Sequence, residues 1–156
     1  LHFGYLSRIT PEQPVYSPSR VTNPHSRPTS EPNLWVSAES SFERPEWIEL
    51  NWQEPKAIAE LQILFDSSLH FHFWQSWQGY PVNAIPSIVR DYRIVATHED
   101  GSTSLVAEVA DNHQRNCRHS VNLKDVRRVT VEVIQTHGLS RAQIYSVRAF
   151  SPSSSS

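Results

Sequence analysis

Hydrophobic and polar residues alternate along most of the chain from residue 46 onward, and a period of two is typical of β-strands with one buried face. In one such segment Ile48, Leu50 and Trp52 share a side, while the residues between them point the other way. The strands predicted by this alternation are Glu46–Trp52, Ala57–Phe65, Asp91–Ala96, Leu105–Ala110, His119–Leu123, Val129–Ile134 and Gln143–Phe150, with further short strands near Phe3–Ile9 and Val15–Tyr16.

Turn signals separate these segments. Gln53–Pro55 is expected to form a turn, and Glu99–Ser102 a hairpin, because its Asp-Gly pair accepts the positive φ that tight turns require. No stretch shows sustained helical periodicity. The pattern therefore predicts an all-β fold, an antiparallel β-sandwich of the jelly-roll kind, and not alternating strands and helices.

One segment breaks the alternation. His70–Pro86 reads HFHFWQSWQGYPVNAIP, follows neither the strand nor the helix period, and is predicted to be a long loop. Long loops in compact domains are usually functional or disordered, and the aromatic content of this one favours function. The expected organisation is an irregular segment over residues 1–25 that packs on the sandwich, the sandwich itself over 26–151, and a serine-rich tail over 152–156.

Composition narrows the function classes. The 156 residues fit a single domain with its own core. The formal net charge is -2 and no basic block is present, so nucleic acid is not an expected partner. No apolar run approaches the length of a membrane span, and no signal peptide is visible at Leu1. Cys117 is the only cysteine, which excludes an internal disulfide.

The strand segments also carry a family pattern. Its parts are Leu34–Ser37, Pro45–Trp52, Leu61–Asp66, Val89–Ile94, Val129–Val133 and Ala142–Phe150. Together they resemble the discoidin-type domain, also called the coagulation-factor type C or galactose-binding-like domain, over about Ser26–Phe150. The resemblance implies a galactose-binding-like jelly roll, and sugar-binding members of that family use loops at one rim of the sandwich.

Two further segments, Asp111–His119 and Thr136–Ala142, are similar in order and spacing to the discoidin-like domain at the C-terminus of certain bacterial FAD-dependent oxidoreductases. This resemblance implies a parent catalytic domain as a partner. No dinucleotide-binding fingerprint is present, so the flavin is not expected to bind this chain and no cofactor is predicted.

Aromatic side chains divide into two groups. Trp35, Trp47 and Trp52 lie in the matched strands, and core packing is favoured over a sugar platform for them. For Trp74 and its neighbours in the long loop, two interpretations are about equally favoured. Flat aromatic rings stack on pyranose faces, but the loop could equally fold back and seal one end of the sandwich. The loop residues proposed to bind ligand are His72, Trp74, Trp77 and Tyr80.

A polar run between two strands supplies the other candidate ligand contacts, Asn112, His113, Gln114 and Arg115. Sugar sites need hydrogen-bond donors and acceptors beside an aromatic platform, and these residue types provide both. The alternative, slightly favoured on the residues alone, is a solvated turn with an arginine paired to a carboxylate.

No metal site is predicted. His70 and His72 would point the same way on a strand, but a third ligand is not near them in sequence. Calcium is the common structural ion of the family that the chain resembles. Members usually bind it with an aspartate before the first tryptophan and a glutamate in the closing strand. Here the corresponding positions read Asn23–Pro28 and Ser146, and both departures weigh against calcium.

A catalytic constellation is not recognisable either. Asp66, Glu99 and Asp100 sit in matched strands or turns, and Cys117 is expected to be a buried, inert thiol. The sequence therefore predicts a domain that is not an enzyme.

Three functions follow from these observations, and the first is preferred. It is a non-catalytic carbohydrate-binding accessory domain of a larger enzyme, acting on a poly- or oligosaccharide in a secreted or periplasmic setting. The second is a structural or protein-interaction module that packs against a parent catalytic domain, with the same aromatic residues as an interface. The third, a free-standing enzyme, would require a convergent acid–base pair at the rim.

Overall fold

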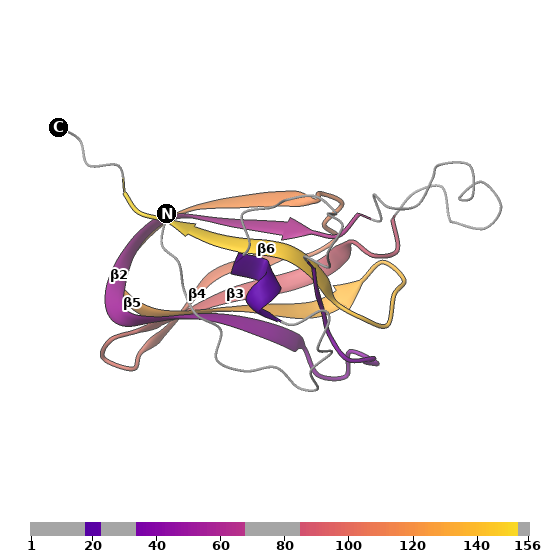
Figure 1. Cartoon of the computed structure of the whole chain (residues 1–156), viewed down its shortest axis with the longest axis horizontal. Coiled ribbons are helices and arrows are strands. Elements are labelled where there is room, and N and C mark those ends of the chain that lie inside the picture. Colours follow the sequence, from indigo (N-terminus) through magenta and orange to yellow (C-terminus); the bar gives the residue numbers. More distant parts are fainter. Residues whose placement is uncertain (1–17, 23–33, 68–84, 153–156) are drawn as a thin grey trace.

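The computed structural model describes residues 18–22, 34–67 and 85–152. The expected strands near Phe3–Ile9 and Val15–Tyr16 and most of the aromatic loop lie outside these residues. The described elements are a short 3₁₀ helix η2 (Pro18–Thr22) and the strands β1 (Trp35–Val36), β2 (Glu46–Phe65), β3 (Val89–His98), β4 (Thr103–Val109), β5 (Asn116–Thr136) and β6 (Gln143–Phe150) (Figure 1). None of the helical residues described forms a segment long and apolar enough to cross a membrane.

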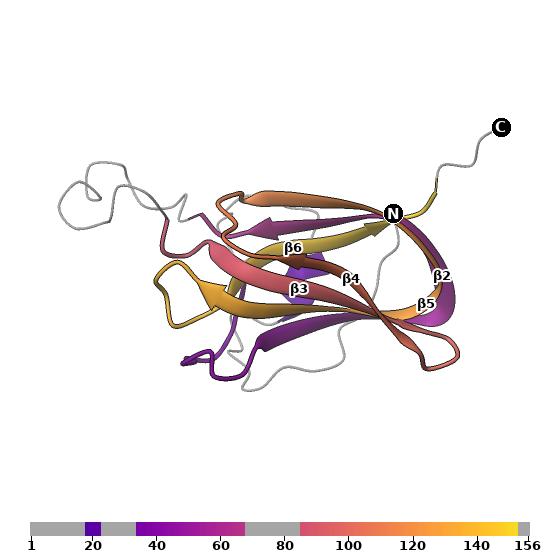
Figure 2. The ribbon, with the colours of Figure 1, turned by 180° about the vertical axis from the view of Figure 1, so that it is seen from behind.

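Two layers of antiparallel strands form the sandwich, and the long strands β2 and β5 run through both. The first part of β2 pairs with the last part of β5, which in turn pairs with β3, and β4 forms the outer edge. The last part of β2 pairs with the first part of β5 on one side and with β6 on the other. The strand order is β1-β6-β2-β5-β3-β4, continuous around the bend that Figures 1 and 2 show at one end.

The bend corrects two sequence predictions. Residues 53–55 are not a turn but part of β2, and the segments predicted as His119–Leu123 and Val129–Ile134 are joined in β5. Pro55 cannot donate to a strand ladder, and the β2–β5 register shifts between Asn51 and Lys56, so the chain bends there without leaving the sheet. On β5 the corresponding corner is formed by Asp125, whose φ is +53°.

The core lies between the layers, and its inward faces are those that the alternation predicts. Ile48, Leu50 and Trp52 are all buried. Val129, Val131 and Val133 have no exposed surface at all. The inward faces of the two layers meet, and their buried side chains form one hydrophobic cluster. Its largest fully buried side chains include Trp35, Tyr92, Phe65 and Ile144, and Val21 of η2 joins the same cluster.

The β3–β4 hairpin turn is confirmed. Gly101 has a φ of +83°, as the Asp-Gly pair predicts, and its N–H donates to the carbonyl of His98. Asp100 Oδ1 accepts hydrogen bonds from the N–H of Ser102 at 2.9 Å and from its hydroxyl at 2.6 Å. These two bonds lower the pKa of the Asp100 carboxyl, because they stabilise its ionised form.

Candidate functional site

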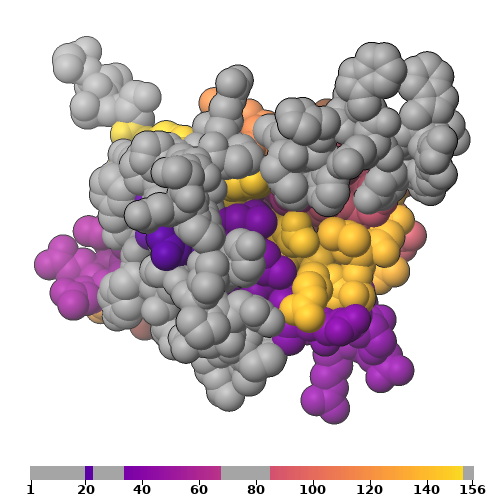
Figure 3. Space-filling view, turned by 45° about the vertical axis from the view of Figure 1, so that its right-hand side comes forward, coloured from indigo at the N-terminus to yellow at the C-terminus, as the bar shows by residue number. Residues whose placement is uncertain are grey.

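The candidate site lies at the end of the sandwich opposite the bend, where the connecting loops gather. Residues 110–115 join β4 to β5, and residues 137–142 join β5 to β6. Residues 37–45 join β1 to β2 and contact the second of these loops, since the N–H of Ser40 donates to the carbonyl of Ser140 at 2.7 Å. Figure 3 turns this end forward and shows the yellow atoms of the chain from about residue 137 onward beside the purple atoms of residues 34–45. We call this loop-bearing end the rim.

Asn112 fixes the shape of the 110–115 loop. It is 7 % exposed, and its side-chain NH₂ donates to the carbonyls of Val89 and Gln114 at 2.8 and 3.0 Å. Its side-chain oxygen accepts from the N–H of Gln114 at 2.9 Å, and its own N–H donates to the carbonyl of Arg90. An amide with these internal partners is a structural anchor, which the residue type in a loop could not reveal.

Asp111 precedes this anchor in a left-handed conformation, with a φ of +54°. Its N–H donates to Asp91 Oδ1 at 2.9 Å, and Asp91 is held by Arg90, whose Nε and Nη2 lie 3.0 and 2.7 Å from Asp91 Oδ2. The Arg90 guanidinium holds the pKa of the Asp91 carboxyl below its usual range. The aspartate backbone is thereby fixed while its own side chain stays exposed.

His113 and His137 approach Asp111 from two different loops. His113 Nε2 lies 3.2 Å from Asp111 Oδ1, and the rings of His113 and His137 have centroids 4.5 Å apart. His137 Nε2 lies 2.7 Å from the carbonyl oxygen of Asn112, and its N–H donates to the carbonyl of Ile88. One nitrogen or oxygen ligand atom from each of the three side chains lies within 4.8 Å of the other two.

Arg115 ends the loop, and its guanidinium lies 5.4 Å from the centroid of the Tyr145 ring. Tyr145 is buried on β6, and the carbonyl of Arg115 accepts from the N–H of Phe65 at 2.8 Å. A guanidinium over an aromatic face is held by the quadrupole of the ring as well as by packing. The arginine is thus held beside β6 by the ring of Tyr145, and its backbone is bonded to the end of β2.

A hollow of about 440 Å³ adjoins the rim between β4 and the first part of β5. Its floor contains Tyr92, whose hydroxyl oxygen lies 3.0 Å from His119 Nε2. Burial raises the pKa of Tyr92 and lowers the pKa of His119, because it disfavours the charged form of each. The lining residues are Tyr92, Val109, Ala110, Asp111, Asn112, His113, Gln114, Cys117, Arg118 and His119.

Cys117 is buried beside this hollow, and burial raises the pKa of its thiol. Its Sγ lies 3.5 Å from Asn112 Oδ1, so the thiol is a further internal partner of the Asn112 amide. The prediction that Cys117 is buried is confirmed, and a raised pKa makes a thiol a poorer nucleophile at neutral pH.

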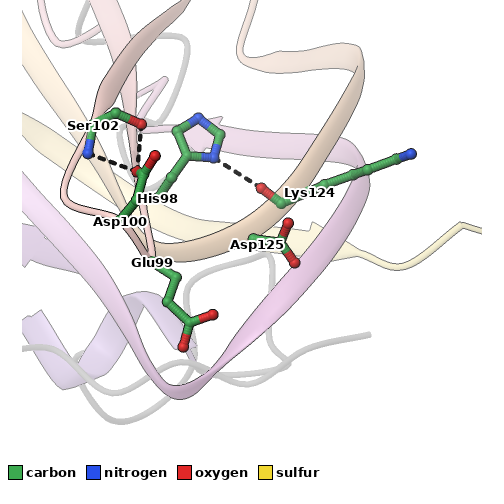
Figure 4. Close-up of a pocket in the computed structure, with 6 residues that line it drawn as sticks. All are labelled: His98, Glu99, Asp100, Ser102, Lys124 and Asp125. Atoms are coloured by element: carbon green, nitrogen blue, oxygen red, sulfur yellow. Dashed lines mark hydrogen bonds between the residues drawn. The ribbon is translucent and has the colours of Figure 1, made fainter.

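A second hollow, of about 420 Å³, lies at the opposite end beside the β3–β4 hairpin (Figure 4). His98 is held there by Nδ1, 2.8 Å from the Lys124 carbonyl, and by Nε2, 2.9 Å from the Ser104 hydroxyl. The Asp100 carboxylate points back to Ser102 within its own turn (Figure 4). The side chains of His98 and Asp100 therefore have structural roles, in the hairpin and at the adjoining corner of β5.

The remaining sequence candidates fall in different places. Trp35 and Trp52 are buried in the core, as favoured, and Trp47 is half-buried. Ser146, the position compared with a calcium ligand, is buried on β6. The residues that lie outside the described part of the chain are Asn23–Pro28, His70, His72, Trp74, Trp77 and Tyr80.

The sequence reasoning missed His137. The residue belongs to a matched segment, but nothing in its own neighbourhood marks it as a partner of Asp111 and His113. No signal in the sequence could have found it, because the two connections are brought together by the hydrogen bonds of Asn112 to Val89 and of His137 to Ile88.

This two-layered antiparallel arrangement is the galactose-binding-like β-sandwich. The chain is similar in structure to a family 32 carbohydrate-binding module from Streptococcus pneumoniae EndoD, with a TM-score of 0.70 and 14% sequence identity over 96% of each chain. A fucose-binding module of Streptococcus pneumoniae gives a TM-score of 0.68 at 10% identity, covering 96% of this chain and 94% of that one.

A third similar structure is the family 32 module of Clostridium perfringens NanJ in complex with galactose. Its TM-score is 0.61 at 14% identity, covering 90% of this chain and 88% of that one. No family model matches the sequence, and no curated protein matches it either. At these identities the likeness establishes the fold.

Proposed function

We propose that the chain is a non-catalytic carbohydrate-binding domain that recognises a poly- or oligosaccharide at the rim. The observation that carries the proposal is the loop of residues 110–115. It presents exposed His113 and Gln114 beside a hollow, on a fold shared with a fucose-binding module and with a family 32 module in complex with galactose. Such domains accompany a larger enzyme, so a parent catalytic domain and a secreted or periplasmic setting belong to the same proposal.

The proposed contacts follow from the chemistry of each side chain. Gln114 offers a carbonyl acceptor and an NH₂ donor, and His113 one donor and one acceptor when neutral, which suits vicinal hydroxyls. Arg115 contributes donors, with its orientation set by Tyr145. Asn112 acts by positioning the loop, since its amide is used internally. For Trp74, Trp77, Tyr80 and His72 the proposal rests on the sequence, where aromatic rings suit stacking on a sugar.

Glycan-array screening followed by calorimetric titration tests this proposal. We expect binding to at least one glycan, a clear loss of affinity in Gln114→Ala, and a larger loss in a Trp74→Ala and Trp77→Ala pair. Gln53→Ala is the matched control, because it makes the same change at an exposed position on the bend. Binding to no glycan, or variants that bind as tightly as the wild type, would refute the proposal.

A second candidate function, packing against a parent catalytic domain, is favoured by one observation. Leu105 is 59 % exposed on β4, which is the outer strand of its layer. An edge strand with an exposed leucine offers both backbone hydrogen bonds and apolar surface to a partner. Deleting the domain from a longer reading frame separates the two functions. Lost solubility of the remainder supports packing, while lost retention on polysaccharide supports binding.

A further inference from the structure

The three side chains Asp111, His113 and His137 have the composition of a transition-metal site. Two imidazoles and one carboxylate are the ligand set that suits Zn²⁺ and similar divalent ions, whereas calcium prefers oxygen ligands alone. The candidate ligand atoms lie within 4.8 Å of one another. We propose that these residues bind one divalent transition-metal ion, with zinc as the reference case, at the rim.

One pair in the cluster, His113 and Asp111, already has the spacing of two metal ligands. In a tetrahedral zinc site with bonds of about 2.0–2.1 Å, neighbouring ligand atoms are separated by about 3.3 Å. His113 Nε2 and Asp111 Oδ1 lie 3.2 Å apart. In a metal-bound His113 the ring proton would sit on Nδ1, so the ion would replace the hydrogen bond between these two side chains.

The third ligand is oriented by a backbone carbonyl. The carbonyl oxygen of Asn112 can only accept, so the proton of the His137 ring must sit on Nε2, 2.7 Å away. In the neutral ring this leaves the lone pair on Nδ1 free for a metal ion. A hydrogen bond from the non-ligating nitrogen to a carbonyl is the usual support of a metal-bound histidine.

The residues that support the cluster are held by hydrogen bonds within the protein. Asn112 is buried and bonded to Val89 and Gln114, and the N–H of Asp111 is held by Asp91. Arg90 is paired with Asp91, while the Asp111 carboxylate belongs to the cluster itself and contributes a negative charge that attracts a cation. Asp111 and His113 are exposed, so the metal keeps an open position toward solvent.

The site goes beyond the proposed sugar binding and can be tested without any sugar. Chelator-treated protein is titrated calorimetrically with ZnCl₂. We expect one zinc ion per chain, and visible absorption when Co²⁺ is used as the probe. His113→Ala and Asp111→Asn should each weaken zinc binding by at least about ten-fold. Both changes are at exposed positions, and asparagine tolerates a positive φ, so folding is preserved.

Two control variants test for zinc binding by three of the other histidines. His98→Ala changes a histidine at the opposite end, and a His70→Ala and His72→Ala pair removes the histidines of the aromatic loop. Both should bind zinc as the wild type does. The proposal is overturned if the wild type binds no zinc, if binding persists unchanged in His113→Ala and Asp111→Asn, or if only the loop pair abolishes it. Glycan titrations with zinc and with chelator then show separately whether sugar binding depends on the metal.

Discussion

His137 Nε2 lies 2.7 Å from the backbone carbonyl oxygen of Asn112, and this contact joins the two loops that form the centre of the rim. Both residues are also bonded to the chain where β3 begins: the His137 N–H donates to Ile88, just before the strand, and the Asn112 side chain donates to Val89, its first residue. The rim loops are therefore tied to a strand whose own side chains enter the core. This connection explains how exposed residues such as His113 can have defined positions.

Replacing Asn112 by alanine should destabilise the domain. The change removes four side-chain hydrogen bonds, including the one from the Cys117 thiol, and leaves the Val89 carbonyl without this partner in a buried setting. We expect a loss of about 2–3 kcal/mol, because each buried group left unsatisfied costs about 1–3 kcal/mol. Urea denaturation measures it, with Gln114→Ala as the exposed control within about 0.5 kcal/mol of wild type. Equal stability of the two variants would show that Asn112 does not anchor the loop.

The corner of β5 gives a prediction of backbone strain. Asp125 is exposed and has a φ of +53°, so substitutions there act mainly through the backbone. Asp125→Val should cost about 1–2 kcal/mol, since β-branched residues avoid the left-handed region. Asp125→Gly should stay within about 0.5 kcal/mol, because relief of strain offsets the greater freedom of the unfolded chain. Thermal and urea denaturation would contradict this if valine were tolerated as well as glycine.

Arg115 and Tyr145 give a prediction about a cation over an aromatic ring. Arg115→Lys keeps the charge but loses the planar guanidinium, and should cost about 0.5–1 kcal/mol of stability. Arg118→Lys is the matched control, since Arg118 is exposed and its contact with Glu60 lies at the surface. An exposed ion pair contributes little, so the control should change stability by less than about 0.5 kcal/mol. Chemical denaturation of both variants decides whether the ring contact matters.

The inward faces of the strands were predictable because burial of one side of a strand imposes a period of two on its own sequence. Val131 and Ile94 carry that signal and are fully buried. The continuity of β2 through Pro55 was not predictable in the same way. A local sequence containing proline fits a turn as well as a bend, and only the register with β5 distinguishes them.

The candidate site was predictable only in part. The polar run containing His113 identified one rim loop, because its residue types suit a ligand and interrupt the strand pattern. The internal use of Asn112 and the approach of His137 could not be predicted, since both depend on how β3 and β5 place their ends in space. Side-chain chemistry was visible in the sequence, and the partners of each side chain were not.

His119 makes the stability of the domain depend on pH. It is half-buried on β5, next to the Tyr92 hydroxyl at 3.0 Å, and burial lowers its pKa from the usual 6.5 in the folded state. In the unfolded chain the ring takes up a proton as the pH falls through about 6.5, while the folded protein resists protonation until a lower pH. The contribution of His119 to stability is thus complete above about pH 6.5 and is lost as the pH falls through the folded-state pKa.

The test compares urea denaturation of the wild type and His119→Gln between about pH 7.5 and pH 4.5, the range that spans this titration. We expect the wild type to lose more stability than the variant as the pH falls, so the two curves converge at the acidic end. Ser120→Gln places the same side chain at the next, exposed position of β5 and should keep the wild-type slope. Parallel curves for the wild type and His119→Gln would mean that the buried ring does not titrate with folding.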